Sequence, residues 1–151
     1  MKVLHAISIM ICFLITCSCD KIEDSRIPRN HPVYLELYLD AEDRDLVPMS
    51  AYKFFTINNI NISSQRVGYA GVLVYHGVDG NYYAFDMACP HEASRNSIIQ
   101  MSDDGIYAVC PTCKSKYDIS HGIGNPVEGP SRFTLRRYSV SRVGNKLYVR
   151  N

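Results

Sequence analysis

Three cysteines and one histidine lie in two short segments, and this pattern constrains the fold more than any other feature. The segments read Cys89-Pro90-His91 and Cys110-Pro111-Thr112-Cys113, and residues 92–109 separate them. A thiolate two residues from an imidazole, and two thiolates three residues apart, are spacings that let the side chains of each segment converge on one metal centre. Each proline stiffens its segment and removes a backbone donor. The fold must therefore hold two loops side by side, and loops held by hairpins are the usual place for such a site.

The remainder of the chain has the pattern of β-strands and turns. Its 151 residues include 11 Tyr, 7 Pro and no Trp, a composition that favours strands over a helical bundle. No long stripe of helical period and no internal repeat occurs. The sequence predicts one all-β domain over residues 33–151, with the two loops inside a region of about 86–130. The strand signals cover 33–39, 54–62 and 68–75, a hairpin turn at Asp79-Gly80 before 81–85, and a terminal hairpin of 137–142 and 146–150.

Charge and motifs exclude several functional classes. The chain has 16 basic and 15 acidic residues and a formal charge of +1, so no long-range basic field is present to attract nucleic acid. It has no nucleophile elbow, phosphate-binding glycine loop or helical zinc-protease motif. Asp86, Glu92 and Asp118 lie near the two loops, and we interpret them as acceptors that shape loops rather than as general acids. We expect no catalytic turnover from this chain itself.

The N-terminus has the pattern of an export signal. Lys2 precedes an apolar run from Val3 to Ile15, which is shorter than the roughly 20 residues of a membrane span. The run ends in small residues and cysteine, and it resembles a bacterial lipoprotein signal. We expect residues 1–18 to be a signal peptide and Cys19 to be the lipidated residue, with Cys17 as the alternative; an ordinary cleaved signal remains open. Residues 19–32 are polar and interrupted by proline, which predicts a tether.

The three remaining cysteines allow other interpretations. Cys110 and Cys113 could form a small disulfide with Cys89 left free, as cysteines of exported proteins often do, although an odd number of thiols argues against it. A thioredoxin-like redox pair would need a strand–helix–strand setting that the pattern does not predict. A structural zinc ion held by three cysteines and one histidine is chemically reasonable.

The sequence around the ligands resembles the Rieske iron–sulfur domain over about residues 68–150. That family has Cys-x-His, a gap of similar size, Cys-x-x-His, then a serine, an aromatic residue and an aspartate, a glycine turn and a Gly-Pro loop over the cluster. The corresponding residues here are Ser115, Tyr117, Asp118, Gly122, Gly129 and Pro130. The resemblance implies a small antiparallel sandwich or barrel with ligand loops at hairpin tips. It also implies a 2Fe–2S cluster covered by the Gly129-Pro130 loop.

One ligand departs from the family pattern, because Cys113 stands where a Rieske domain has its second histidine. Carried over, Cys89 and Cys110 hold one iron, and His91 and Cys113 hold the other. His121 is the nearest substitute imidazole, but we expect it at the surface, as we expect of His31 and His76. The oxidised core carries two positive charges, so three thiolates leave one net negative charge, which favours the oxidised state. We therefore expect a potential lower than that of two-histidine sites, an intermediate or low value bracketed by their range of roughly −150 to +300 mV and by the about −400 mV of all-cysteine ferredoxins.

These expectations define two functions. The first is a membrane-anchored 2Fe–2S electron-transfer protein, lipid-anchored in the bacterial cell envelope and serving an unknown redox partner protein. The second is a structural zinc-binding or apo domain in which the fold persists without redox activity. The loops lack the additional cysteines that form a bridge in the Rieske proteins of respiratory complexes, so the site is more similar to ferredoxin and oxygenase-associated Rieske domains.

Overall fold

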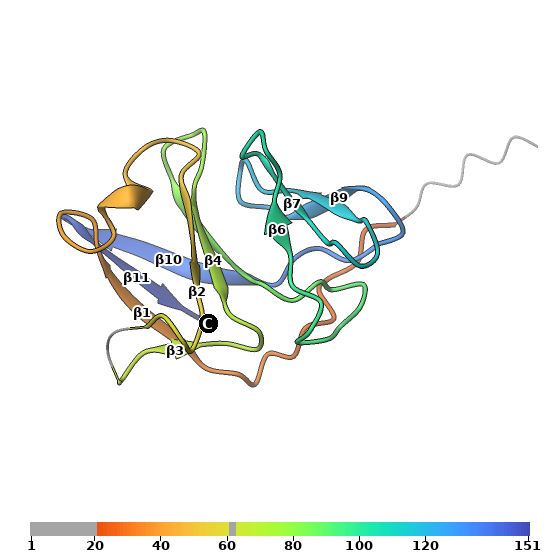
Figure 1. Ribbon diagram of the computed structural model, residues 1–151, viewed down its shortest axis with the longest axis horizontal. Coiled ribbons are helices and arrows are strands. Elements are labelled where there is room, and N and C mark those ends of the chain that lie inside the picture. Colours follow the sequence, from red (N-terminus) through yellow and green to blue (C-terminus); the bar gives the residue numbers. More distant parts are fainter. Residues whose placement is uncertain (1–20, 61–62) are drawn as a thin grey trace, which may run out of the picture.

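The chain folds into two antiparallel sheets in this computed structural model, which describes residues 21–60 and 63–151. Seven strands form a barrel-like, nearly closed sheet in the order β2-β4-β5-β10-β11-β1-β3, and four short strands form a second sheet in the order β6-β7-β8-β9 (Figure 1). In the part described there is one short 3-10 helix, η1 (Arg44–Leu46), and no α-helix. The larger sheet contains β1 (Val33–Tyr38), β2 (Tyr52–Phe55), β3 (Arg66–Val67), β4 (Val72–His76), β5 (Tyr82–Asp86), β10 (Arg137–Val143) and β11 (Lys146–Arg150). The smaller contains β6 (Gln100–Met101), β7 (Tyr107–Val109), β8 (Lys116–Asp118) and β9 (Asn125–Glu128).

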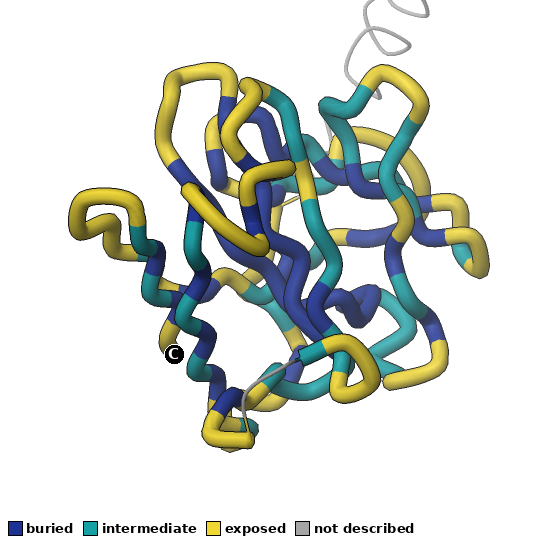
Figure 2. The backbone as a smooth tube through the Cα atoms, turned by 60° about the vertical axis from the view of Figure 1, so that its left-hand side comes forward, coloured by how far each residue is buried: buried dark blue, intermediate teal, exposed yellow. Residues whose placement is uncertain are grey.

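Strands β4 and β5 are buried on both faces and join the two sheets. Val72, Val74 and Ala84 point into the core of the barrel, which also contains Leu35 and Leu37 of β1. The alternate residues of the same two strands pack into a second core, and Figure 2 shows these strands as a dark blue band. That second core contains Leu73, Tyr75, Tyr83 and Phe85 together with Cys89, Cys110 and Tyr117. Cys89 and Cys110, two of the expected metal-binding residues, therefore lie against the face of β4 and β5 that points away from the barrel core.

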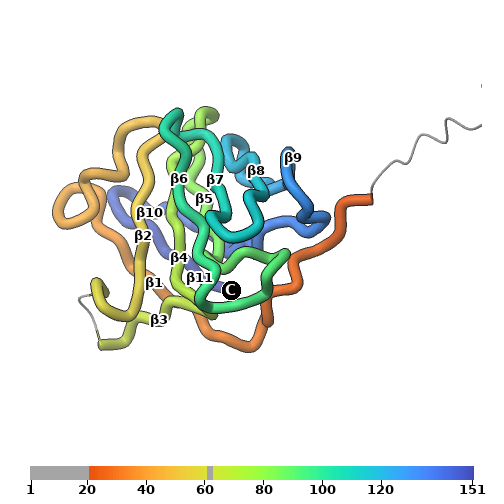
Figure 3. Tube along the Cα trace, turned by 45° about the vertical axis from the view of Figure 1, so that its right-hand side comes forward, coloured from red at the N-terminus to blue at the C-terminus, as the bar shows by residue number. Residues whose placement is uncertain are grey.

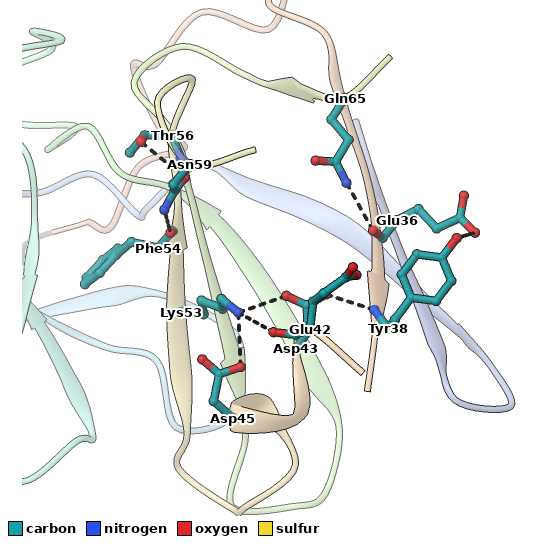
Figure 4. A network of polar contacts seen from close by, with 10 residues as sticks. All are labelled: Glu36, Tyr38, Glu42, Asp43, Asp45, Lys53, Phe54, Thr56, Asn59 and Gln65. Atoms are coloured by element: carbon teal, nitrogen blue, oxygen red, sulfur yellow. Dashed lines mark hydrogen bonds and ion pairs between the residues drawn. The ribbon is translucent and has the colours of Figure 1, made fainter. Parts of the chain in front are cut away.

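The predicted all-β class is confirmed, and so are both hairpins. Asp79-Gly80 turns between β4 and β5, and β10 pairs with β11. The strand expected over 54–62 was wrong in extent: β2 ends at Phe55. The reason is local, because the Asn59 side chain accepts from the Thr56 N–H at 2.6 Å and donates to the Phe54 carbonyl at 2.7 Å, which closes a turn (Figure 4).

A polar network ties β2 to the end of β1 (Figure 4). The ammonium of Lys53 on β2 lies 3.0 Å from the Asp43 carboxylate and 3.1 Å from that of Asp45. Asp43 in turn accepts from the backbone N–H of Tyr38 at 2.9 Å. The segment between the two strands is thereby fixed to β2, which is an edge strand of the larger sheet.

Residues 21–32, the described part of the expected tether, lie along the domain. Glu23 forms a parallel bridge with Phe133, and the Ile27 side chain is only 2% exposed. In Figure 3 this red-orange segment runs beside the blue segment that leads into β10. The predicted signal peptide 1–18 and both candidate lipidated cysteines, Cys17 and Cys19, lie outside the described residues. Among the residues described, no helix has the length and apolar character needed to cross a membrane.

Candidate metal centre

Two loops of similar construction carry the predicted ligands. The first follows β5, where the Ala93 N–H donates to the Cys89 carbonyl at 2.9 Å; the second joins β7 to β8, where the Lys114 N–H donates to the Cys110 carbonyl at 2.9 Å. Ala93 and Lys114 both have positive φ, of 51° and 63°, so each loop turns back sharply at the fourth residue after its cysteine. This shared turn directs the residues between towards a common point.

The structure brings the three cysteines together. The sulfur atoms of Cys89, Cys110 and Cys113 all lie within 4.8 Å of one another, and those of Cys89 and Cys113 are 3.6 Å apart. Cys89 and Cys110 are fully buried and Cys113 is half-buried. All three are free thiols, so the alternative of a Cys110–Cys113 disulfide is not realised.

His91 lies in the first loop beside this group but is not one of its members. It is half-buried, and its backbone carbonyl accepts a long hydrogen bond of 3.4 Å from Arg26. Within residues 21–60 and 63–151 the His91 imidazole makes no hydrogen bond, so neither ring nitrogen is committed to another group. His121 is exposed as expected, with Nδ1 2.9 Å from the Ser120 hydroxyl. His76 was wrongly expected at the surface: it is buried and stacked on Tyr82, with ring centroids 4.2 Å apart.

Several donors surround the sulfur atoms. The Tyr117 hydroxyl lies 3.2 Å from the Cys89 sulfur, and the backbone N–H groups of His91 and Glu92 interact with the same sulfur. The second loop repeats the arrangement, because the N–H groups of Thr112 and Cys113 interact with the Cys110 sulfur. Donors aimed at sulfur stabilise the thiolate, which is the form that binds metal.

The two buried thiols differ in acidity. Burial raises the pKa of Cys89 to about 12, despite the hydrogen bonds from Tyr117 and the backbone. Burial also acts to raise the pKa of Cys110, but its backbone donors and the neighbouring Cys89 outweigh it, and the pKa is lowered. Burial and the Cys89 sulfur raise the pKa of Tyr117, so its hydroxyl remains a donor at neutral pH.

The Gly129-Pro130 loop lies over the second ligand loop. Gly129 has a φ of +88°, and a Cβ placed there would lie 2.5 Å from the Ser115 Cα, so this close approach requires glycine. The Ser115 hydroxyl accepts from the Ser131 N–H at 3.0 Å and from the Cys113 thiol at 3.2 Å. Ser115 thus connects the covering loop to a cysteine of the group.

The Asp86 side chain is hydrogen-bonded to the backbone at the start of the first ligand loop. This fully buried carboxylate accepts from the Tyr138 hydroxyl at 2.6 Å and from the N–H groups of Tyr69 at 2.9 Å and Ala88 at 2.8 Å. The sequence indicated Asp86 as an acceptor that shapes a loop, but it did not identify Tyr138. No local signal links these two residues, which are 52 positions apart.

The donor set suits an iron–sulfur cofactor. Three converging cysteine side chains, surrounded by N–H and O–H donors and with a histidine in the same loop as Cys89, are the ligand types and the surroundings that such clusters use. The residues present therefore fit a 2Fe–2S cluster.

Comparison with known proteins agrees with this geometry. The Rieske [2Fe-2S] domain family matches residues 49–139. A chain in the complex of reduced oxygenase and oxidised ferredoxin of carbazole 1,9a-dioxygenase superimposes with a TM-score of 0.52 and 21% identity, over 78% of this chain and 93% of that one. The quaternary ammonium Rieske monooxygenase CntA superimposes with a TM-score of 0.54 and 11% identity, over 79% of this chain and 31% of that one. Both similarities concern the fold.

The search of curated proteins gave no significant match. The family match nevertheless spans more than half of the chain and both ligand loops. The chain belongs to the Rieske [2Fe-2S] domain family, a membership that implies a 2Fe–2S cluster as the cofactor.

Proposed function

We propose that this chain is a lipid-anchored electron-transfer protein of the bacterial cell envelope, with a cluster held by Cys89, His91, Cys110 and Cys113. The observation that carries the proposal is the convergence of three sulfur atoms within 4.8 Å, in two loops of a Rieske domain. Cys89 and Cys110 would bind one iron, and His91 and Cys113 the other. A bound 2Fe–2S cluster supplies one-electron transfer.

The residues of the chain tune and protect that centre. Tyr117 and the backbone N–H groups of both loops donate to the buried sulfur atoms, and this stabilises their negative charge. The Gly129-Pro130 loop packs on Ser115, which is fully buried. A third thiolate, from Cys113, adds negative charge relative to a two-histidine site, so we expect a potential well below about +100 mV.

Redox exchange requires a partner protein, which the sequence does not name. The carbazole 1,9a-dioxygenase structure is a complex of a ferredoxin with an oxygenase. By analogy, the partner of this chain would be a separate redox protein, reached at the membrane surface because Cys19, or alternatively Cys17, carries the lipid.

The decisive experiment is anaerobic purification of the full chain from membranes, followed by iron, sulfide and zinc analysis and EPR spectroscopy of the reduced protein. We expect two irons and two sulfides per chain and a reduced-state EPR signal. His91→Ala should abolish the native signal, whereas His121→Ala, which removes an exposed imidazole, should leave it unchanged. If His91→Ala retains its iron as His121→Ala does, the assignment of His91 as a ligand is wrong. Mass spectrometry of Cys19→Ala and Cys17→Ala variants tests which cysteine is acylated.

One observation favours a structural zinc ion as a second candidate. With Zn–S bonds of about 2.3 Å, two sulfur atoms on one tetrahedral ion lie about 3.8 Å apart. The Cys89 and Cys113 sulfur atoms, which the first proposal assigns to different irons, are 3.6 Å apart. A colourless protein that contains one zinc and no sulfide would establish this alternative.

A further inference from the structure

The segment that enters the domain from the N-terminus is fixed beside residues 132–134, which follow the Gly129-Pro130 loop. The Glu23 N–H donates to the Arg132 carbonyl at 2.7 Å, and the Thr134 N–H donates to the Glu23 carbonyl at 2.9 Å. The Arg26 guanidinium lies over the Phe133 ring at 5.1 Å, and the Ile27 side chain is buried. From Glu23 onward the segment cannot swing away from the domain without breaking these contacts.

An apolar surface lies next to the point where this segment begins. It consists of Ile22, Ile123, Val127, Gly129 and Pro130, and we call it the proline-loop face. Ile22, Ile123 and Val127 are 47%, 56% and 49% exposed, and exposed apolar side chains that gather on one face mark an interaction surface. A groove of about 560 Å³ runs between Ile22 and Pro130, and Val127 links it to a second hollow lined by Ile123. The apolar residues thus form one continuous surface.

The surroundings of this face are basic. Three hollows lie along this face, and each is lined by at least one of Ile22, Val127 and Ile123. Together they are lined by five basic side chains and three acidic ones, Asp24, Asp118 and Glu128. Glu128 is paired with Lys116 at 3.5 Å, which reduces its effect. The basic side chains are Lys21, Arg29, Arg132, Arg136 and Arg137. Aliphatic side chains bordered by lysine and arginine match the boundary between acyl chains and anionic headgroups.

The length of chain before the fixed segment limits how far this face can lie from a membrane. Cys19 precedes Glu23 by four residues, which span at most about 14 Å when fully extended. Lys21, which lines the groove, is two residues from Cys19, or at most about 7 Å. A lipid on Cys19 would therefore hold the proline-loop face at the headgroup region.

We infer that the proline-loop face is a membrane-contact surface for anionic lipid, which orients the domain with its ligand-loop end towards the bilayer. The inference rests on the proposed lipid anchor. It has a functional consequence, because Gly129 packs directly on Ser115 and Ser115 contacts Cys113. Electron exchange would then occur with a partner at the membrane surface rather than with one far from it.

The absence of tryptophan from the chain provides a clean probe. Val127→Trp places a single indole on the proline-loop face. Val143→Trp is the matched control: Val143 is 65% exposed and ends β10, in a hairpin at the end of the molecule opposite the N-terminal segment (Figure 1). The lipidated full chain of each variant is reconstituted into phosphatidylcholine–phosphatidylglycerol vesicles that contain brominated acyl chains.

We expect the brominated lipid to quench Val127→Trp at least about twofold more than Val143→Trp, since interfacial groups lie about 5–10 Å into the headgroup boundary. Equal quenching of the two variants in vesicle-bound protein would overturn the inference and leave the anchor intact. Failure of the protein to float with the vesicles would remove the anchor and the inference together. The visible absorption of each variant shows separately whether the cluster is bound.

Discussion

Gly129→Ala tests whether the covering loop is packed on the second ligand loop. The residue has a φ of +88°, and a conformation of this kind costs a residue with a Cβ about 1–2 kcal/mol. The new methyl group would also lie 2.5 Å from the Ser115 Cα and 2.9 Å from the Ser115 N, both backbone atoms. Overpacking against a structure that cannot rotate away costs a further ~1–3 kcal/mol. The expected loss of unfolding free energy is the sum, about 2–5 kcal/mol.

Gly80→Ala is the matched control, because Gly80 has a similar φ of +80° and a Cβ there would have no atom within 4 Å. It should cost only the backbone part, about 1–2 kcal/mol. Denaturant unfolding of both variants isolates the packing contribution as their difference, which corresponds to a melting temperature lower by roughly 2–12 °C in Gly129→Ala.

Cluster content provides an independent measurement on the same two proteins. Displacement of the loop from Ser115 would open the centre to water, so Gly129→Ala should lose iron faster than Gly80→Ala. If the two variants unfold at the same denaturant concentration, the loop does not press on Ser115 and this account of the covering loop is wrong.

Four further substitutions test single features. Cys113→His removes a thiolate, so redox titration should show a potential raised towards the range of roughly −150 to +300 mV; a lower potential would contradict the charge argument. Tyr117→Phe removes the donor 3.2 Å from Cys89 and should lower the potential, with a stability loss of about 0.5–1.5 kcal/mol in urea unfolding. Asp86→Asn weakens hydrogen bonds to a buried charge and should cost about 1.5–3 kcal/mol by the same assay; a neutral result would refute its supporting role. The Tyr83 hydroxyl and Asn81 lower the pKa of Asp79 to about 2, so its carboxylate stabilises the fold above pH 3.8 and this stabilisation is lost as the pH falls towards 2. The melting-temperature difference between wild type and Asp79→Asn should accordingly close over that interval, and a constant difference would contradict it.

Local signals account for the parts of the structure that the sequence predicted. The turn at Asp79-Gly80 and the terminal hairpin each join neighbouring strands, so their residue types alone indicate the pairing. The tight turns that carry the cysteines are local in the same sense, because each ligand loop is closed by its own backbone hydrogen bond. Both features are decided within a few residues of chain.

The parts that the sequence did not predict depend on contacts between distant residues or on very short strands. Strands β6 to β9 contain two to four residues each, too few to show a periodic pattern. The polar segment at 21–32 was expected to be a tether, yet Glu23 pairs with Phe133 near the other end of the chain. His76 shows the same limit, since its burial comes from packing on Tyr82 of the next strand.

A cysteine at position 113, where the family has a histidine, changes the charge of the centre more than it changes the hydrogen bonds that hold the loops. The hydrogen bond from the Ser131 N–H to the Ser115 hydroxyl and the contact of the Tyr117 hydroxyl with the Cys89 sulfur do not involve the Cys113 side chain. The cysteine side chain is smaller than an imidazole ring, and the Cys113 sulfur lies 3.6 Å from the Cys89 sulfur. The same scaffold can therefore hold a more negative cluster or a single ion. Because both outcomes preserve the fold, the metal and sulfide content decides between them, and stability measurements alone cannot.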